Sequence, residues 1–208
     1  MRVLITNNTL AMRAGSELYV RDIALELLAR GHEPIAYSRH LGEVARELRN
    51  ASVVVVDDLS ELTQPPDVIH AQHHLEAMTA ITRYPNVPAI FMCHGWLPPQ
   101  EAPPTHPRIY HYLAVDELVK SRLIDECGLA SERVQLRLNF VDLSRFKQRP
   151  ALPTKARRAL AFSNYINDAN VLPALQEGCK QVGIELDVLG ASSGNAAERP
   201  EAIIGEYD

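Results

Sequence analysis

Three short stretches of the sequence combine residue types that bind polar ligands. The first is Gly15-Ser16-Glu17, which opens a segment whose apolar residues recur at helical spacing. A glycine lets a ligand approach the backbone, and the first N–H groups of a helix favour anions. The same residues can also begin a helix with Ser16 as its cap and no ligand, so both interpretations stay open.

The second stretch contains His70, His73 and His74, in Ile-His-Ala-Gln-His-His at the end of an apolar run. Three histidines can bind zinc. No carboxylate or thiol stands at a matching spacing, however, and a strand would send His70 and His73 to opposite faces. We therefore expect polar contacts to a ligand, or a plain loop, in preference to a metal site.

The third stretch, His94-Gly95-Trp96, follows the apolar run of residues 88–93. Trp96 could stack on a sugar or a base. It stands beside a proline-rich segment, residues 97–107, so it could equally serve packing alone.

The elements that carry these stretches alternate between strand and helix. Residues 2–6, 15–30 and 32–37 read as strand, helix and strand, with Gly31 as the helix stop, which is a βαβ unit. The same alternation continues along the chain, with further strands predicted at 51–56, 67–71, 88–93, 108–115 and 133–139 and helices at 42–50, 75–84 and 116–127. It predicts a doubly wound, Rossmann-like α/β domain over residues 1–146.

The apolar run of residues 51–56 indicates a strand buried on both faces. In such sheets ligands bind in the crevice outside the carboxyl ends of the strands. All three polar stretches follow predicted strands, so they should share one rim of the sheet. This convergence predicts a binding site there.

The architecture restarts after a linker at residues 147–155, which contains Pro150 and Pro153. Strands are predicted at 158–162 and 184–189, with a helix at 169–183 between them. Residues 156–208 are too few for a complete doubly wound domain, so we expect an incomplete, truncated second α/β domain. Its open sheet edge could be covered by a partner chain, including a second copy in a homo-oligomer.

The composition indicates what kind of protein this is and which partners to expect. The 208 residues are 46% hydrophobic and 23% charged, with a net charge of −5 and no basic block. Nucleic acid is therefore not an expected partner. Cys93, Cys127 and Cys179 are far apart, which suggests reduced thiols. No signal peptide and no apolar run of about 18 residues is present, so we expect a cytoplasmic protein without a transmembrane segment. Peripheral membrane contact is left open, although the charge does not favour an anionic lipid surface.

Taken in order, these motifs resemble the GT-B-fold retaining glycosyltransferases of family 4. The resemblance rests on the first strand, the Ala14-Gly-Ser-Glu17 loop, Arg30-Gly-His32, Asp67-Val-Ile-His-Ala71, His94 and Asn139-Phe-Val-Asp-Leu-Ser-Arg-Phe146. The family's usual forms are Gly-Gly-x-Glu and Asn-Gly-Val-Asp-x-x-x-Phe. Ala14 and Phe140 each replace a glycine here.

The resemblance implies an acceptor-binding N-terminal domain, a nucleotide-binding C-terminal domain and catalysis in the cleft between them. It implies a nucleotide-sugar donor, an acceptor of unknown identity, no metal and no other cofactor. Gly15 would approach the donor diphosphate or the acceptor. His94 would be catalytic, contacting the donor sugar through its side chain or its backbone. The remaining candidates for donor or acceptor binding are Ser16, Glu17, His70, His73, His74, Trp96 and Asn139.

A further departure from the family pattern lies in the second domain. Family members carry an Arg and a Lys there that neutralise the departing diphosphate. The corresponding stretch, residues 162–170, contains neither. We therefore expect the 208-residue chain alone to be weak or inactive. A non-catalytic binding protein that keeps the fold, and a GT-B sugar-nucleotide epimerase, are the alternatives.

Overall fold

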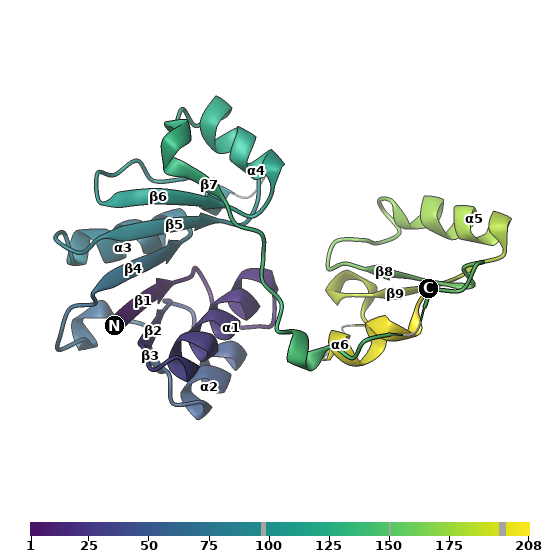
Figure 1. The fold of residues 1–208 in the computed structure, drawn as a ribbon, viewed down its shortest axis with the longest axis horizontal. Coiled ribbons are helices and arrows are strands. Elements are labelled where there is room, and N and C mark those ends of the chain that lie inside the picture. The colour runs from purple at the N-terminus through teal and green to yellow at the C-terminus, as the bar shows by residue number, and fades with distance from the viewer. Residues whose placement is uncertain (97–98, 150, 196–198) are drawn as a thin grey trace. The chain divides into compact units, whose positions relative to one another are not determined.

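A computed structural model of the chain describes residues 1–96, 99–149, 151–195 and 199–208. These residues form two compact units, Met1–Asn139 and Phe140–Asp208 (Figure 1). None of the helices in the described ranges is both long enough and apolar enough to cross a membrane.

The first unit is built on a seven-stranded sheet in which every strand pair is parallel. Its strands are β1 (Arg2–Thr6), β2 (Glu33–Tyr37), β3 (Val54–Val56), β4 (Val68–Gln72), β5 (Ala89–Cys93), β6 (Ile109–Ala114) and β7 (Val134–Leu136). Their order is β3-β2-β1-β4-β5-β6-β7. The chain therefore winds outward from β1 in one direction and from β4 in the other, which confirms the predicted doubly wound fold.

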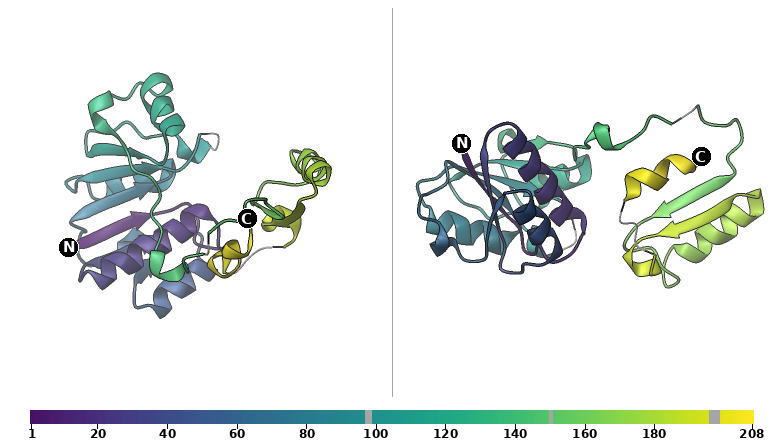
Figure 2. Two further views of the ribbon diagram at one scale, coloured as in Figure 1. Left: turned by 45° about the vertical axis from the view of Figure 1, so that its right-hand side comes forward. Right: turned by 90° about the horizontal axis from the view of Figure 1, so that it is seen from below.

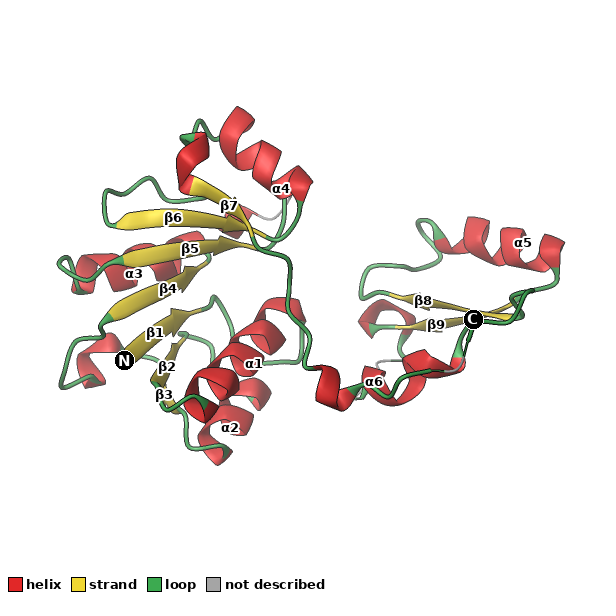
Figure 3. Ribbon diagram, in the orientation of Figure 1, coloured by secondary structure: helices red, strands yellow, loops and turns green. Residues whose placement is uncertain are grey.

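Helices cover both faces of this sheet (Figure 3). They are α1 (Gly15–Ala29), α2 (Glu43–Asn50), α3 (His74–Arg83) and α4 (Glu117–Ser121), which continues as a π-helical segment over Arg122–Glu126. Alternate residues of a strand face opposite sides. Accordingly, Val3 and Ile5 pack in the apolar cluster of α1 and α2, whereas Leu4 packs in the cluster of α3 and α4.

The predicted helix boundaries rest on local chemistry that the structure contains. Gly31 follows α1 with a φ of 78°, a left-handed conformation that ends the helix. Asp116 caps α4, because its Oδ1 accepts a hydrogen bond of 2.7 Å from the Val119 N–H.

The prediction of a strand buried on both faces at residues 51–56 is wrong. β3 contains only Val54–Val56 and is the edge strand of the sheet, with Val54 51% exposed. Ser52 has a φ of 67°, so the preceding residues turn out of α2 instead of entering the sheet.

The loop after β1 is packed against the start of α2. Leu10 is fully buried; its N–H donates to the carbonyl of His40, and its own carbonyl accepts from the Ala45 N–H. The Glu43 N–H donates to the carbonyl of Ala11 at 2.8 Å. These bonds fix the path of the chain between β1 and the first turn of α1.

The second unit contains the parallel pair β8 (Arg158–Phe162) and β9 (Glu185–Leu189). Its helices α5 (Leu172–Val182) and α6 (Pro200–Ile203) lie on opposite faces of this pair (Figure 2). Residues 140–146 also belong to this unit, and Arg145 Nη2 donates to Glu201 Oε2 at 3.1 Å. The boundary between the units therefore lies ahead of residue 146, where the sequence predicts the first domain to end.

Candidate functional site

The carboxyl ends of β1 and β4 meet at the point where the direction of winding reverses. The Thr6 hydroxyl donates to the carbonyl of Gln72 at 2.8 Å and accepts from the Gln72 N–H at 2.9 Å. Both residues are fully buried. This pair of bonds clamps the two strand ends together, and the residues that follow each strand form the candidate site.

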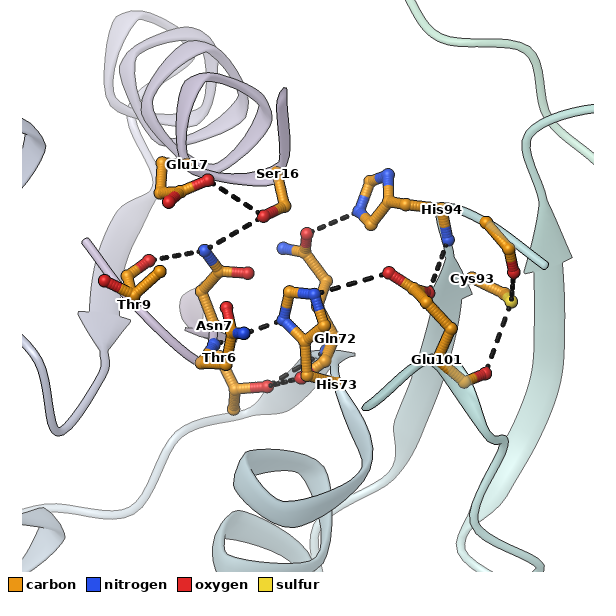
Figure 4. Close-up of polar contacts among 12 residues, drawn as sticks. Thr6, Asn7, Thr9, Ser16, Glu17, Gln72, His73, Cys93, His94 and Glu101 are labelled. Atoms are coloured by element: carbon orange, nitrogen blue, oxygen red, sulfur yellow. Dashed lines mark hydrogen bonds and ion pairs between the residues drawn. The ribbon is translucent and has the colours of Figure 1, made fainter. Parts of the chain in front are cut away.

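His73, directly after β4, is held in one tautomer. Its Nδ1 accepts a hydrogen bond of 3.1 Å from the Asn8 N–H, so the proton of the neutral ring lies on Nε2. Nε2 faces Glu101 Oε1 at 3.3 Å and donates to it (Figure 4). With a φ of 58°, His73 also makes the turn from β4 into α3.

Glu101 joins His73 to the end of β5. Its other oxygen, Oε2, accepts the His94 N–H at 2.7 Å, and the residue is only 4% exposed. Burial raises the pKa of Glu101, but the hydrogen bonds from His73 and from the His94 backbone outweigh burial and hold the pKa below its ordinary value. The carboxylate is therefore ionised and acts as a fixed anchor for the loop.

Sequence reasoning missed Glu101. The only available signal is that it is the single acidic residue in the proline-rich segment of residues 97–107. Its contacts with His73 and with the His94 N–H form only when the loop folds back onto the strand ends, so the sequence does not indicate them.

The loop after β5 is held at further points. The Cys93 thiol donates to the carbonyls of Gly95 and Glu101, and Arg122 Nη1 donates to the carbonyl of Gly95 at 3.2 Å. Burial raises the pKa of the Cys93 thiol to about 12, so this thiol is not a reactive nucleophile. The loop is thus anchored on both sides of His94.

His94 itself is neutral at pH 7. Burial lowers its pKa to about 4, a shift that the nearby Glu101 charge opposes and His73 reinforces. Its Nε2 donates to Gln72 Oε1 at 2.6 Å, with the Gln72 amide oriented as drawn in Figure 4. In that tautomer Nδ1 carries a lone pair, and it forms no hydrogen bond with any described residue. His94 therefore offers a hydrogen-bond acceptor to a ligand.

Two buried amide atoms at the same place lack partners among the residues that the structure describes. They are Asn7 Oδ1 and Gln72 Nε2, an acceptor and a donor on fully buried side chains. The two point toward one another in Figure 4. An unsatisfied buried polar atom costs about 1–3 kcal/mol. A hydroxyl group, which both donates and accepts, would satisfy both atoms.

The start of α1 borders these atoms. Asn7 Nδ2 donates to the carbonyl of Thr9 at 2.6 Å and lies 3.4 Å from Ser16 Oγ. Gly15 is exposed, and a Cβ atom there would meet no atom of the described residues within 4 Å. The first turn of α1 therefore presents its free N–H groups through an open approach.

Ser16 does not cap α1, which was one of the two interpretations that the sequence left open. The N-cap residue is Ala14, which has no side chain for the purpose, and Ser16 Oγ instead donates to the buried Glu17 Oε2 at 3.0 Å. Because Ser16 lies inside the first turn, its hydroxyl cannot reach back to the N–H groups that a cap serves.

His70 and Tyr19 line the side of the cluster nearest α1. His70 Nε2 lies 3.5 Å from Tyr19 Oη, and the Tyr19 ring packs edge-on against the His94 ring at 4.7 Å between centroids. Burial, followed by the charge of His94, lowers the pKa of His70 to about 4, and burial raises the pKa of Tyr19 to about 12. Sequence reasoning missed Tyr19, although it lies one helical turn after Gly15 and hence on the same side of α1.

Four predicted site residues lie outside this cluster, and the first is Glu17, whose buried carboxylate accepts from the Ser16 hydroxyl. His74 is exposed and donates through Nδ1 to the carbonyl of Ala102 at 3.0 Å. Trp96 is 44% exposed and makes no ring contact in the described part of the chain. Asn139 is exposed at the end of the first unit, beyond the edge strand β7, and no hydrogen bond joins it to the cluster.

We call the remaining set the switch-point cluster; it comprises Asn7, Gly15, Ser16, Tyr19, His70, Gln72, His73, His94 and Glu101. Within the described residues, no group of three or more His, Cys, Asp or Glu side chains is placed to hold a metal ion. Both oxygens of the ionised Glu101 are already bound, so what the cluster offers a ligand is neutral donors and acceptors beside a helix N-terminus. That combination suits a polyhydroxylated or phosphorylated ligand.

A doubly wound sheet with this polar rim, followed by a second parallel α/β unit, matches part of the GT-B fold of glycosyltransferases. The chain belongs to Glycosyltransferase Family 4, whose family model matches residues 13–145. A search of curated proteins finds no match.

Solved structures agree on the fold. A glycosyltransferase from Rickettsia africae has a TM-score of 0.66 at 14% identity, covering 100% of this chain and 71% of that one. Anabaena HepE, solved with UDP-glucose, has a TM-score of 0.59 at 14% identity, covering 99% and 72%. Sucrose-phosphate synthase from Thermosynechococcus elongatus has a TM-score of 0.59 at 14% identity, covering 91% and 62%.

Proposed function

We propose that this chain contributes the acceptor-side domain, and part of the donor-side domain, of a retaining glycosyltransferase. Family membership sets the class of reaction. The observation that supports a ligand site is the buried pair Asn7 Oδ1 and Gln72 Nε2 in the switch-point cluster. An acceptor and a donor without partners, beside a helix N-terminus, match a sugar hydroxyl next to a phosphate.

His94 takes the role of contacting the donor sugar through its side chain. Its backbone N–H is already bound to Glu101 and its Nε2–H to Gln72, which leaves Nδ1 to accept from a sugar hydroxyl. The open N–H groups at Gly15 would meet the donor diphosphate or an acceptor phosphate.

The reaction is a front-side displacement. The acceptor oxygen bonds to the anomeric carbon on the face from which the diphosphate oxygen departs, and the departing phosphate takes the proton of the acceptor hydroxyl. Negative charge develops on the diphosphate and requires cations or N–H donors nearby. Residues 162–170 supply no Arg or Lys, so donor affinity of this chain alone is expected to be weak.

A non-catalytic binding protein is the second candidate, and this missing pair of cations is the observation that favours it. Such a protein would hold a nucleotide-sugar or an acceptor at the switch-point cluster without turning it over. The two candidates differ in product formation and not in where the ligand binds.

Saturation-transfer NMR with UDP-glucose tests the proposal, because the method detects weak binding. We expect saturation of the sugar protons, reduced in His94→Ala and retained in His74→Ala, whose exposed ring lies outside the cluster. Release of UDP in ³¹P spectra of the same samples would favour catalysis over binding alone. Absence of saturation with UDP-glucose, GDP-glucose and ADP-glucose would contradict the glycosyltransferase proposal. Micromolar affinity for UDP or GDP in calorimetry would contradict the expected weak donor binding.

A further inference from the structure

A pocket opens on the first unit at the carboxyl ends of β2 and β3. Its volume is about 340 Å³, within the range of about 300–1,000 Å³ typical of small-molecule sites. Tyr37, the last residue of β2, packs in the core on the α3 face of the sheet. Gln72 follows Ala71 of that same core along β4, so its side chain points to the opposite face. The pocket and the switch-point cluster are therefore separate sites.

Tyr37 gives this pocket a hydroxyl group that no described residue bonds. The residue is 3% exposed and lines the pocket, and its hydroxyl makes no hydrogen bond with any residue that the structure describes. Burial raises the pKa of Tyr37, so the hydroxyl keeps its proton. The hydroxyl is therefore available to a ligand both as a donor and as an acceptor.

Two arginines line the same pocket, Arg39 from the loop after β2 and Arg83 from α3. Neither forms an ion pair or a side-chain hydrogen bond within the described ranges. Arg83 lies over the ring of Tyr84, with 5.2 Å from the guanidinium carbon to the ring centroid. Such stacking orients a guanidinium while leaving its N–H donors free.

Two carboxylates balance the arginines. Asp57 and Asp58 follow β3, and Asp58 Oδ1 accepts the Ser60 N–H at 2.7 Å. That bond, first among the causes, holds the pKa of Asp58 below its ordinary value, so the carboxylate is ionised. The formal charges of these four lining side chains therefore sum to zero.

This balance decides which ligand fits. The two arginines would attract an anion, but the two aspartates would repel it. A cation would be attracted by the aspartates and repelled by the arginines. A sugar hydroxyl accepts from a guanidinium and donates to a carboxylate, so a neutral ligand with several hydroxyls uses both kinds of group. The buried Leu59 adds apolar surface for the C–H face of a sugar ring.

We propose that the pocket between β2, β3 and α3 binds a neutral saccharide. The inference rests on the residues of this pocket alone. It holds whether or not the switch-point cluster takes part in sugar transfer.

Saturation-transfer NMR on the 208-residue chain tests this with a panel of neutral probes: glucose, galactose, mannose, N-acetylglucosamine, maltose and sucrose. Inorganic phosphate, observed by ³¹P line broadening, is the anionic arm. We expect at least one saccharide to bind. Its affinity should fall about fivefold in Tyr37→Phe, the loss expected for one removed hydrogen bond, and also fall in Arg83→Gln. It should be unchanged in His74→Ala, whose exposed ring lies outside both sites.

Tyr37→Phe keeps the buried ring, and thermal unfolding checks that the variant folds; should it fail, the exposed Arg83→Gln decides alone. Binding of phosphate without any saccharide would overturn the proposal, as would binding of none of the probes. Saccharide binding that survives both pocket variants but is lost in His94→Ala would also overturn it, because the sugar would then occupy the switch-point cluster.

Discussion

His94 Nε2 lies 2.6 Å from Gln72 Oε1, so the last residue of β4 sets the orientation of the residue that follows β5. The bond fixes the tautomer of His94 and turns its Nδ1 lone pair toward any ligand. It also turns the Gln72 amide nitrogen toward Asn7. One hydrogen bond between neighbouring strand ends thus prepares two of the groups that our proposal gives to the ligand.

Gly15→Ala should separate binding from stability. A Cβ atom at this position meets nothing within 4 Å, and Gly15 begins α1 without a positive φ. The free energy of unfolding should therefore rise by up to about 1 kcal/mol, because alanine restricts the unfolded chain. Saturation transfer to UDP-glucose should nevertheless fall, because the methyl group blocks approach to the backbone. Gly178→Ala in α5, where space is also open, should leave the ligand signals unchanged; equal effects of the two variants would contradict a ligand at Gly15.

Glu101→Gln should destabilise the first unit by about 2–4 kcal/mol, since two hydrogen bonds to a charged acceptor are weakened. Glutamine keeps one acceptor oxygen and places an NH₂ group against the His94 N–H or His73 Nε2–H. Urea unfolding measures the loss, and the exposed Glu132→Gln is the matched control, expected within about 0.5 kcal/mol of wild type.

The pH dependence of this carboxylate follows from the direction of its shift. The folded pKa of Glu101 is lowered, so its contribution is present above the ordinary value of 4.5 and is lost as pH falls through the folded pKa. Glu101→Gln should therefore lose more stability at pH 7 than below the folded pKa. An equal loss at both would contradict the role of the ionised carboxylate.

The buried histidines should make the folded protein sensitive to acid at higher pH values than those at which Glu101 titrates. His70 and His94 have pKa values lowered from 6.5 to about 4, so the unfolded chain binds protons between these values and the native state does not. The contribution of the two neutral histidines to the free energy of unfolding is fully present above pH 6.5. It falls toward pH 4, by up to about 3 kcal/mol for each histidine.

Unfolding free energies at pH 7 and pH 5 test this window. His70→Gln should reduce the difference between the two values, because it removes one titrating ring. Ile5→Val lowers stability without removing such a group and should keep the full difference. If His70→Gln retained the wild-type pH dependence, the assignment of that dependence to His70 would be wrong.

Gly42→Ala should be strongly destabilising, in contrast to Gly15→Ala. The added Cβ would lie 2.5 Å from the Ala11 carbonyl oxygen and 2.7 Å from the Ala11 Cα, both backbone atoms that cannot rotate away. We expect a loss of about 1–3 kcal/mol, the range for overpacking, and a lower melting temperature. An unchanged melting temperature would show that the loop after β1 is not held against α2.

The parts of the fold that the sequence predicts are those governed by local signals. Gly31 and Asp116 mark helix ends through their own backbone and side chain, and they do so in the structure. The edge position of β3 has no such signal, because an apolar run does not reveal how many neighbours its strand will have. Val54 is half-exposed for that reason. For the start of α1, the sequence and the structure differ only in which residue is the cap. The apolar spacing fits a cap at Ala14 as well as one at Ser16.

The candidate site follows the same division. His70, His73 and His94 are predictable as strand-end residues, since parallel strands bring their carboxyl ends to one rim. Glu101 is not, because it reaches His73 across a long separation in sequence through the folding of a proline-rich loop. His74 has the same residue type as His73, but the turn at His73 places it on the surface. The residue types at the strand ends therefore predict that a site exists, whereas the turns and loops of the backbone determine which residues belong to it.

The central claim, that a nucleotide-sugar occupies the switch-point cluster, is tested most directly by ¹⁵N–¹H correlation spectra of the chain titrated with UDP-glucose. The side-chain NH₂ of Gln72, whose nitrogen has no partner among the described residues, gives its own pair of signals in such spectra. We predict that this pair and the backbone amides of Gly15 and Ser16 shift progressively with ligand concentration. Unchanged Gln72, Gly15 and Ser16 signals at a ligand concentration that shifts other residues, or that shifts none, would contradict the account.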